Sequence, residues 1–208
     1  DGTYEDCAVD IDDIYVIVKR TINSSTKHYI ERLDDDRTTD ASFQLFDGSA
    51  DGNKPTSTTV SGLSHLEGKT VECVRDDIFL GEKTVSSGQI TIDQVPTSYV
   101  EIGLHHDVLA KTLPAEPRLA SGTMVGRKKR IVAVSPVLNQ TQNIAINGNE
   151  VSLKQFPYTL DSSETLFTGR KRVTPLLGYS VEAQISITQT KPLFFTLLSL
   201  EYSVSGSQ

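Results

Sequence analysis

The sequence consists of short runs in which apolar and polar residues alternate, and each run is closed by Gly, Asn, Asp, Ser or Pro. Between Ile14 and Lys19 the alternation has the period of two that a pleated strand imposes. Asn23-Ser24-Ser25 follows with short side chains that suit a turn, and a second alternating run extends from Thr26 to Leu33. This part of the chain is therefore predicted to form a β-hairpin.

The rest of the chain repeats this pattern and lacks any long stretch of helical periodicity. A second hairpin is predicted at Asn147-Gly148, because both residues accept the positive φ angles of a type I′ turn. Single helical turns are expected at Leu63–Glu67 and Asp107–Thr112, and the apolar run Leu193–Leu200 is expected to be a central strand covered on both faces. We therefore predict an all-β fold, an antiparallel β-sandwich with a smaller inserted β domain.

Two stretches rich in turn residues mark the expected domain boundaries. Residues 47–58 contain Gly, Asp, Ser and Thr around Pro55, and residues 113–126 are interrupted by prolines and glycines. The segment before the first boundary is too small to bury its apolar faces alone. We expect residues 1–58 and 113–208 to form one discontinuous sandwich, with residues 59–112 inserted as a small β domain.

The length of 208 residues is sufficient to bury a core. No apolar run approaches the roughly 20 residues that span a bilayer, so no membrane insertion is expected. The chain begins at Asp1 and its only methionine is Met124, from which we expect a fragment or a processed product.

Charge is distributed unevenly along the chain. Residues 1–60 hold 13 acidic and 6 basic residues, residues 61–115 hold 8 and 4, and residues 116–208 hold 6 and 10. An acidic front and a basic back suit head-to-tail contact between copies. The alternative is that both are ordinary solvated surfaces.

Residues that bind metals or act in catalysis form no recognisable pattern. Cys7 and Cys73 lie far apart without metal-type spacing, and free buried thiols are favoured over a disulfide. His105 and His106 are adjacent and would point to opposite faces of a strand, while His28 and His65 are isolated in sequence. There is no Gly-x-Ser-x-Gly elbow and no phosphate-binding glycine loop. We expect neither an enzyme nor a cofactor.

One acidic stretch, Asp47–Asn53, partly imitates a calcium loop, with oxygen ligands at positions one, three and five and glycine at six. Thr58 stands where the bidentate Glu of such a loop belongs, and no helical pattern flanks it. A turn-rich linker is the favoured interpretation.

Two basic runs are the candidate contact residues. They are Arg127-Lys128-Lys129-Arg130 and Arg170-Lys171-Arg172. Such runs neutralise phosphates without reading sequence, so passing contact with DNA is one interpretation. Aromatic residues for base stacking are not interleaved with them. The favoured alternative is that they face solvent or an acidic neighbouring subunit.

Three blocks of sequence follow one another along nearly the whole chain. The first block is Tyr15–Asn23 with Tyr29–Leu33; the second is Ser61–Val71 with Val85–Thr91 and Val100–Leu104; the third is Gly126–Arg130 with Leu166–Gly169 and Pro192–Leu198. In this order the blocks resemble the tail nozzle proteins of short-tailed bacteriophages, also called tail tubular protein B-like or stabilisation proteins. Proteins of that family are much longer, so the chain resembles their C-terminal part.

The resemblance implies a non-catalytic structural component of the virion tail, made in the host bacterial cytoplasm. In that family, copies form a ring, taken to be a hexamer, around the DNA ejection channel, next to other tail proteins and in transient non-specific contact with phage DNA. A host-surface-binding β module at the tail tip is the alternative function. A tail-associated hydrolase is a third, which would need carboxylates clustered in a cleft.

Overall fold

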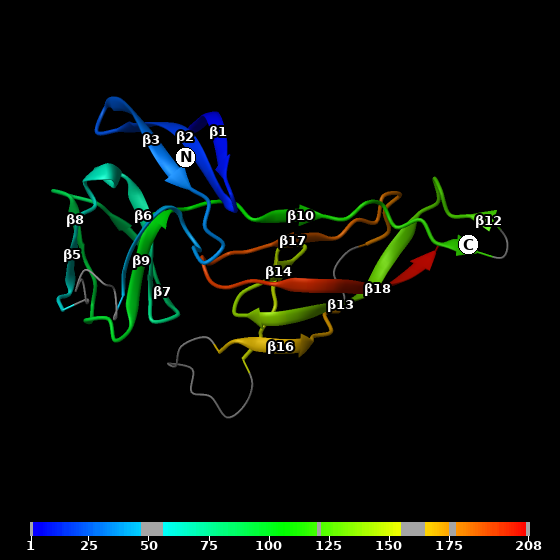
Figure 1. The fold of residues 1–208 in the computed structure, drawn as a ribbon. Coiled ribbons are helices and arrows are strands. Elements are labelled where there is room, and N and C mark those ends of the chain that lie inside the picture. Colours follow the sequence, from blue (N-terminus) through cyan, green and yellow to red (C-terminus); the bar gives the residue numbers. More distant parts are fainter. Residues whose placement is uncertain (1, 47–55, 120–121, 155–164, 175–177, 207–208) are drawn as a thin grey trace. The chain divides into compact units, whose positions relative to one another are not determined.

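The structure, a computed structural model, describes residues 2–46, 56–119, 122–154, 165–174 and 178–206. Within them the one helical element is a short 3-10 helix, η1 (Ser64–Leu66), and all the paired strands run antiparallel. The prediction of an antiparallel all-β fold is confirmed. The chain divides into two compact units, residues 1–106 and 107–208 (Figure 1).

The first unit opens with a three-stranded meander. Its strands are β1 (Thr3–Asp10), β2 (Asp13–Ile22) and β3 (Ser25–Arg32), in that order. Asn23 and Ser24 both have positive φ angles and connect β2 to β3 in a two-residue turn, which confirms the predicted hairpin. Along β2, Val16, Val18, Arg20 and Ile22 are buried, whereas Ile17, Lys19 and Thr21 between them are exposed, as expected for a sheet with one covered face.

A four-stranded and a two-stranded sheet enclose the apolar core of the first unit. The larger has the order β4 (Asp40–Phe46), β9 (Tyr99–Leu104), β6 (Thr70–Arg75), β7 (Ile78–Thr84), and the smaller pairs β5 (Thr59–Ser61) with β8 (Gln89–Thr91). Leu63 and Leu66 at η1 are completely buried in the same core, near the predicted helical turn at residues 63–67. The core residues from the strands are Val60, Val71, Cys73, Ile90, Val100, Ile102 and Leu104.

The opposite face of the four-stranded sheet is also buried, and it holds the segment that leads into β4. One carboxylate oxygen of Glu101 accepts hydrogen bonds from the backbone N–H and the hydroxyl of both Thr38 and Thr39, at 2.8 to 3.1 Å. A Cβ atom at Gly103 would lie 2.3 Å from Thr39 Oγ1, so only glycine fits there. The buried guanidinium of Arg20 contacts Glu31 at 2.8 Å and Asp40 at 3.0 Å, which ties the meander to β4.

The second unit has two sheets that contribute to one core. The first has the order β10 (Leu109–Lys111), β17 (Ser186–Thr188), β14 (Ala145–Ile146), β15 (Asn149–Glu150); the second has the order β16 (Phe167–Arg170), β13 (Lys129–Thr141), β18 (Leu197–Gly206). A small ribbon, β11 (Arg118–Leu119) with β12 (Gly122–Thr123), is separate. Residues from both larger sheets share the core, including Ile131, Val134, Leu138, Ile144, Ile146, Phe167, Ile185 and Ile187. Asn147 and Gly148 form the predicted two-residue turn between β14 and β15, with φ angles of 49° and 77°.

The division of the chain differs from the expected one. We expected residues 1–58 to join residues 113–208 around an inserted domain at residues 59–112, but residues 1–106 form one unit. The reason is the pairing of β4 with β9, which places the end of the first segment in the same sheet as the supposed insertion. The meander and the last strand consequently belong to different units.

Two local expectations were wrong. The run Leu193–Leu200 does not form a central strand, because β18 pairs only with β13 at the edge of its sheet and Leu198 is 63% exposed. The central position belongs to β13 instead. Residues 107–112 are not a helical turn either, since β10 pairs with β17 there.

A carboxylate stabilises the turn between β6 and β7. Asp76, at a φ of 48°, accepts backbone hydrogen bonds from Thr97 and Ser98 at 2.7 Å and from Tyr99 at 3.0 Å. Partial burial alone would raise the pKa of Asp76, but these three donors favour the ionised form and hold the pKa below its usual range.

Substituting Asp76→Asn is therefore expected to lower the free energy of unfolding at neutral pH by about 1–2 kcal/mol. Because the folded-state pKa is lowered, the stabilisation is fully present above the unfolded-state pKa of about 3.9 and is lost as pH falls through the folded-state value. Urea denaturation at a series of pH values measures this difference, which should shrink in acid. Asp35→Asn, at an exposed position of the same unit, is the control; an equal effect there would contradict the assignment.

Candidate functional site

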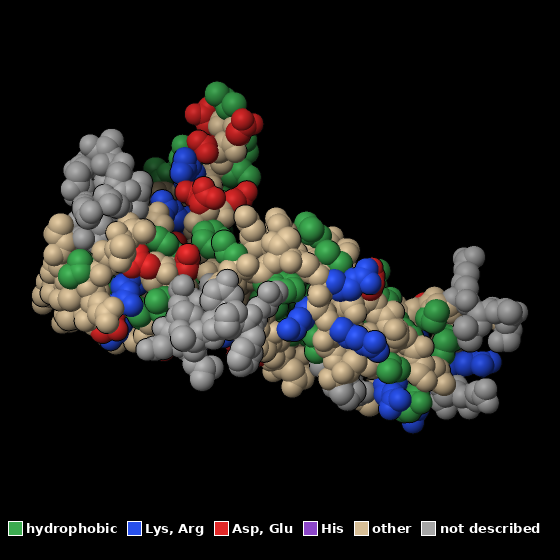
Figure 2. Space-filling model, turned by 90° about the horizontal axis from the view of Figure 1, so that it is seen from below, with side chains coloured by type: hydrophobic (Ala, Val, Ile, Leu, Met, Phe, Trp, Pro, Cys, Tyr) green, Lys and Arg blue, Asp and Glu red, His purple; other side chains and the backbone are tan. Residues whose placement is uncertain are grey.

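The two predicted basic runs lie beside one strand of the second unit. Arg170 of β16 pairs with Val137 of β13, and Val173 pairs with Val134, so Arg172 lies opposite Ser135. Since Val134 and Leu138 face the core, Arg170 and Arg172 project from the outer face of this sheet. Arg130 also projects outward, because its neighbour Ile131 is in the core. The register thus gathers residues 40 positions apart on one face, and Figure 2 shows Lys and Arg side chains distributed over the second unit.

Lys129 does not belong to this basic face. Its side chain is completely buried, and its ammonium contacts Glu116 Oε1 at 2.5 Å and the Met124 carbonyl oxygen at 3.4 Å. It begins β13 on the inner side, one position before outward-facing Arg130. We conclude that Lys129 supports the fold and that the prediction of an accessible run is wrong at this residue.

The other basic residues are accessible, and two of them have partners. Arg170 pairs with Glu201 at 2.6 Å, and both side chains are more than half exposed. The guanidinium of Arg130 lies 5.3 Å from the centre of the Tyr179 ring, within the range of a cation–π contact. Arg127, Lys128 and Arg172 are exposed, and Lys171 is half-buried. Together these side chains provide positive charge for an anionic surface.

The two units carry opposite net charge. Residues 1–106 hold 20 acidic and 9 basic residues, for a net charge of −11, whereas residues 107–208 hold 7 and 11, for a net charge of +4. Opposite net charges on one chain favour contact between unlike units of two copies.

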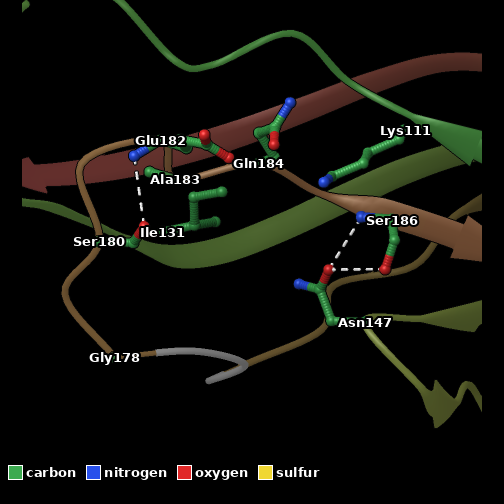
Figure 3. Close-up of a pocket in the computed structure, with 9 residues that line it drawn as sticks. All are labelled: Lys111, Ile131, Asn147, Gly178, Ser180, Glu182, Ala183, Gln184 and Ser186. Carbon is green, nitrogen blue, oxygen red and sulfur yellow. Dashed lines mark hydrogen bonds between the residues drawn. The ribbon is translucent and has the colours of Figure 1, made fainter.

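The second unit also contains a polar cleft of about 320 Å³ (Figure 3). Its lining comes from β10, β13, the β14–β15 turn and residues 178–186. Asn147 Oδ1 accepts hydrogen bonds from the backbone N–H and hydroxyl of Ser186, at 2.8 and 3.1 Å. Asn147 Nδ2 is buried and has no hydrogen-bond partner among the described residues. Lys111 and Glu182 add one charge of each sign to the lining, so the cleft suits a polar ligand.

The cysteines are both free thiols, as expected, but Cys7 is exposed rather than buried. Burial raises the pKa of the Cys73 thiol to about 12, so this cysteine is a poor nucleophile at neutral pH.

His28, His65 and His105 contact different partners in the first unit. His28 is 3.2 Å from Glu5, His65 is 3.3 Å from the Ala41 carbonyl oxygen, and His105 is 3.0 Å from Glu72. Nowhere in the described part of the chain do three or more His, Cys, Asp or Glu side chains form a metal-binding group. The calcium-like stretch at residues 47–53 lies outside the described residues. Likewise, none of the helices described is long and apolar enough to cross a membrane.

The contribution of the Lys129–Glu116 ion pair to stability can be tested by substituting each partner. Glu116→Ala leaves a buried ammonium without its carboxylate and is expected to lower the free energy of unfolding by about 1–3 kcal/mol. Lys129→Met removes the charge and keeps most of the apolar stem, so it should cost less. In the Lys129→Met background, Glu116→Ala should have almost no effect in urea denaturation. Equal costs in both backgrounds would show that the pair does not couple.

Two surfaces of the second unit are therefore candidates for binding. The basic face consists of Arg130, Arg170 and Arg172 on the outside of the sheet, with Arg127 and Lys128 exposed just before β13. Half-buried Lys171 lies between Arg170 and Arg172 and therefore points to the other face of the sheet. The polar cleft is lined by Asn147, whose buried side-chain nitrogen has no hydrogen-bond partner among the described residues. A scan against protein-family models gives no match, and a search of curated proteins finds no similar sequence.

Proposed function

We propose that the chain is a non-catalytic structural component of a bacteriophage tail, in which copies assemble into a ring around the DNA ejection channel. The observation that carries the proposal is the opposite charge of the two units, −11 and +4. A subunit whose two units carry opposite charge favours heterologous contacts, and heterologous contacts close into rings when the rotation between copies is suitable.

Exposed strand edges support the same proposal. Strands β1 and β18 each lie at the edge of a sheet, and β1 is exposed along its whole length. Leu198 and Tyr202 of β18 are largely exposed apolar side chains. Such edges pair readily with other chains unless they are covered, and a neighbouring copy or another tail protein would cover them.

The resemblance to tail nozzle proteins supplies the location in the tail. Its three blocks fall on the β2–β3 hairpin, on the strands around η1, and on the parts of β13, β16 and β18 that surround the second core. The similar residues therefore belong to the framework of both units, which fits a structural protein.

The basic face fits a second part of the proposal, transient contact with DNA. Arg130, Arg172 and Arg170 lie on one face of the sheet, where they would neutralise phosphates without reading bases. The exposed ring of Tyr179 is already engaged by Arg130. Weak contact of this kind would let DNA pass.

Antibody labelling of intact virions tests the location. An antibody raised against the 208-residue chain is expected to label the tail in electron micrographs of negatively stained particles. Preincubation of the antibody with the purified chain is the control and should abolish labelling. Labelling confined to the capsid, or none on particles that contain the chain by immunoblot, would contradict the proposal.

A host-surface-binding module is the second candidate, and the polar cleft is the observation that favours it. The unpartnered amide of Asn147, with Lys111, Gln184 and Glu182 around it, offers donors and acceptors of the kind that bind sugar hydroxyls.

Binding of the purified chain to host cells distinguishes this candidate. If the cleft binds a surface glycan, Asn147→Gly is expected to reduce cell binding several-fold, because glycine retains the turn but removes the amide. Asn149→Gly, in the same turn region but not in the cleft lining, is the matched control. Undiminished binding by the Asn147 variant would exclude the cleft.

A further inference from the structure

The turn between β1 and β2 combines backbone strain with an exposed apolar side chain. Ile11 has a φ of 56° and is 90% exposed. A β-branched residue in this region is an outlier, because its side chain crowds the backbone. Beside it, the directly paired residues Val9 and Ile14 are 68% and 41% exposed. We call Val9, Ile11 and Ile14 the apolar tip.

The other two-residue turns of the described hairpins follow the usual rules. They contain Asn23-Ser24, Asp76-Asp77 and Asn147-Gly148, which are residue types that tolerate positive φ. Ile11 alone among these turns places a large apolar residue where glycine is preferred. Folding gains nothing from this choice, because the side chain is in solvent, and strain of this kind is typical of a binding position.

Acidic residues surround the apolar tip. Asp10 and Asp13 pair with each other at the ends of β1 and β2, and Asp12 lies in the turn between them. All three are within two residues of Ile11. These three carboxylates make binding to phosphates of DNA or of an anionic membrane unfavourable. A partner for the apolar tip would therefore have basic residues next to an apolar centre.

The start of β13 in the second unit has the complementary character. Lys129 and Ser180 exchange two backbone hydrogen bonds of 2.9 Å, which places Tyr179 and Val181 beside the basic run. Tyr179 and Val181 are 49% and 47% exposed; the guanidinium of Arg130 lies over the Tyr179 ring, and exposed Arg127 and Lys128 come just before Lys129 in the chain. We call these five accessible side chains the basic patch; Lys129 is not part of it.

We propose that the apolar tip of one copy docks on the basic patch of a second copy. The proposal rests on the proposed function, since it names the contact by which copies assemble. Ile11 packs against Tyr179 and Val181, and Asp10, Asp12 and Asp13 face Arg127, Lys128 and Arg130. The contact is heterologous, so each copy has one tip and one patch to offer and assembly continues from copy to copy.

Two substitutions in the first unit test the tip. Ile11→Gly relieves the strain and should leave the chain equally or more stable to urea, yet weaken self-association about tenfold in sedimentation velocity across a concentration series. Ile30→Gly removes a similar side chain that is 78% exposed on the same meander and should leave association unchanged. Equal association by the Ile11 variant and the wild-type chain, or a wild-type chain that is monomeric throughout, overturns the proposal.

Charge reversal tests the partner. Asp12→Arg and Arg130→Glu are each expected to weaken self-association about tenfold, because each variant alone brings like charges together at the contact. A mixture of the two variants should regain much of the association, because the tip of each variant then meets a patch of opposite charge on the other. A double variant that carries both changes on one chain should associate with itself better than either single variant. No recovery in the double variant overturns the proposal.

A DNA-binding measurement distinguishes DNA binding by the basic patch from docking of a second copy on it. If Arg130→Glu reduced binding to duplex DNA while self-association stayed unchanged, the patch would be a DNA contact and the proposed docking would be wrong. Failure of docking together with antibody labelling of the tail would reject this contact alone. Docking without tail labelling would retain the contact and reject the tail assignment.

Discussion

The first unit depends on a single carboxylate oxygen. Glu101 lies on the buried face of the four-stranded sheet, where Oε1 receives two backbone N–H groups and two hydroxyls from Thr38 and Thr39. A buried carboxylate is costly unless it is hydrogen-bonded, and here the donors come from the segment that joins the meander to β4. Arg20 adds its contacts to Glu31 and Asp40 on the other side of the same segment. Polar contacts, as well as the apolar core, therefore hold the segment between the meander and β4 in place.

The sequence predicted the local features of the fold well because they depend on neighbouring residues. The β2–β3 hairpin and the Asn147-Gly148 turn need only a period of two and residues that accept positive φ. The partner of β4 could not be predicted in this way, since β9 lies more than 50 residues later and many strands have similar alternation. The exposed edge position of β18 was missed for a related reason. An apolar run predicts that its side chains are buried, but it does not identify the strand or partner that covers them.

The candidate site was predictable as a set of residues but not as a surface. The two basic runs were identified from composition, and only the register of β13 with residues 170–173 brings them to one face. Lys129 could have been excluded from the accessible basic residues, because it lies two positions before Ile131 on the same strand. Residues two apart on a strand face the same side, so the Lys129 side chain points inward like that of Ile131. The hydrogen bonds of Asn147 to Ser186 had no sequence signal, because the two residues are 39 positions apart. Ile11 could have been noticed as an unusual turn residue.

The unequal burial of the two thiols gives the chain a built-in labelling position. Cys73 is enclosed in the first core, whereas Cys7 is exposed on β1, three residues before the turn that carries Ile11. A maleimide dye would attach to Cys7 alone in the folded chain, without any engineered cysteine. Energy transfer between differently coloured dyes would then follow the encounter of two chains in real time.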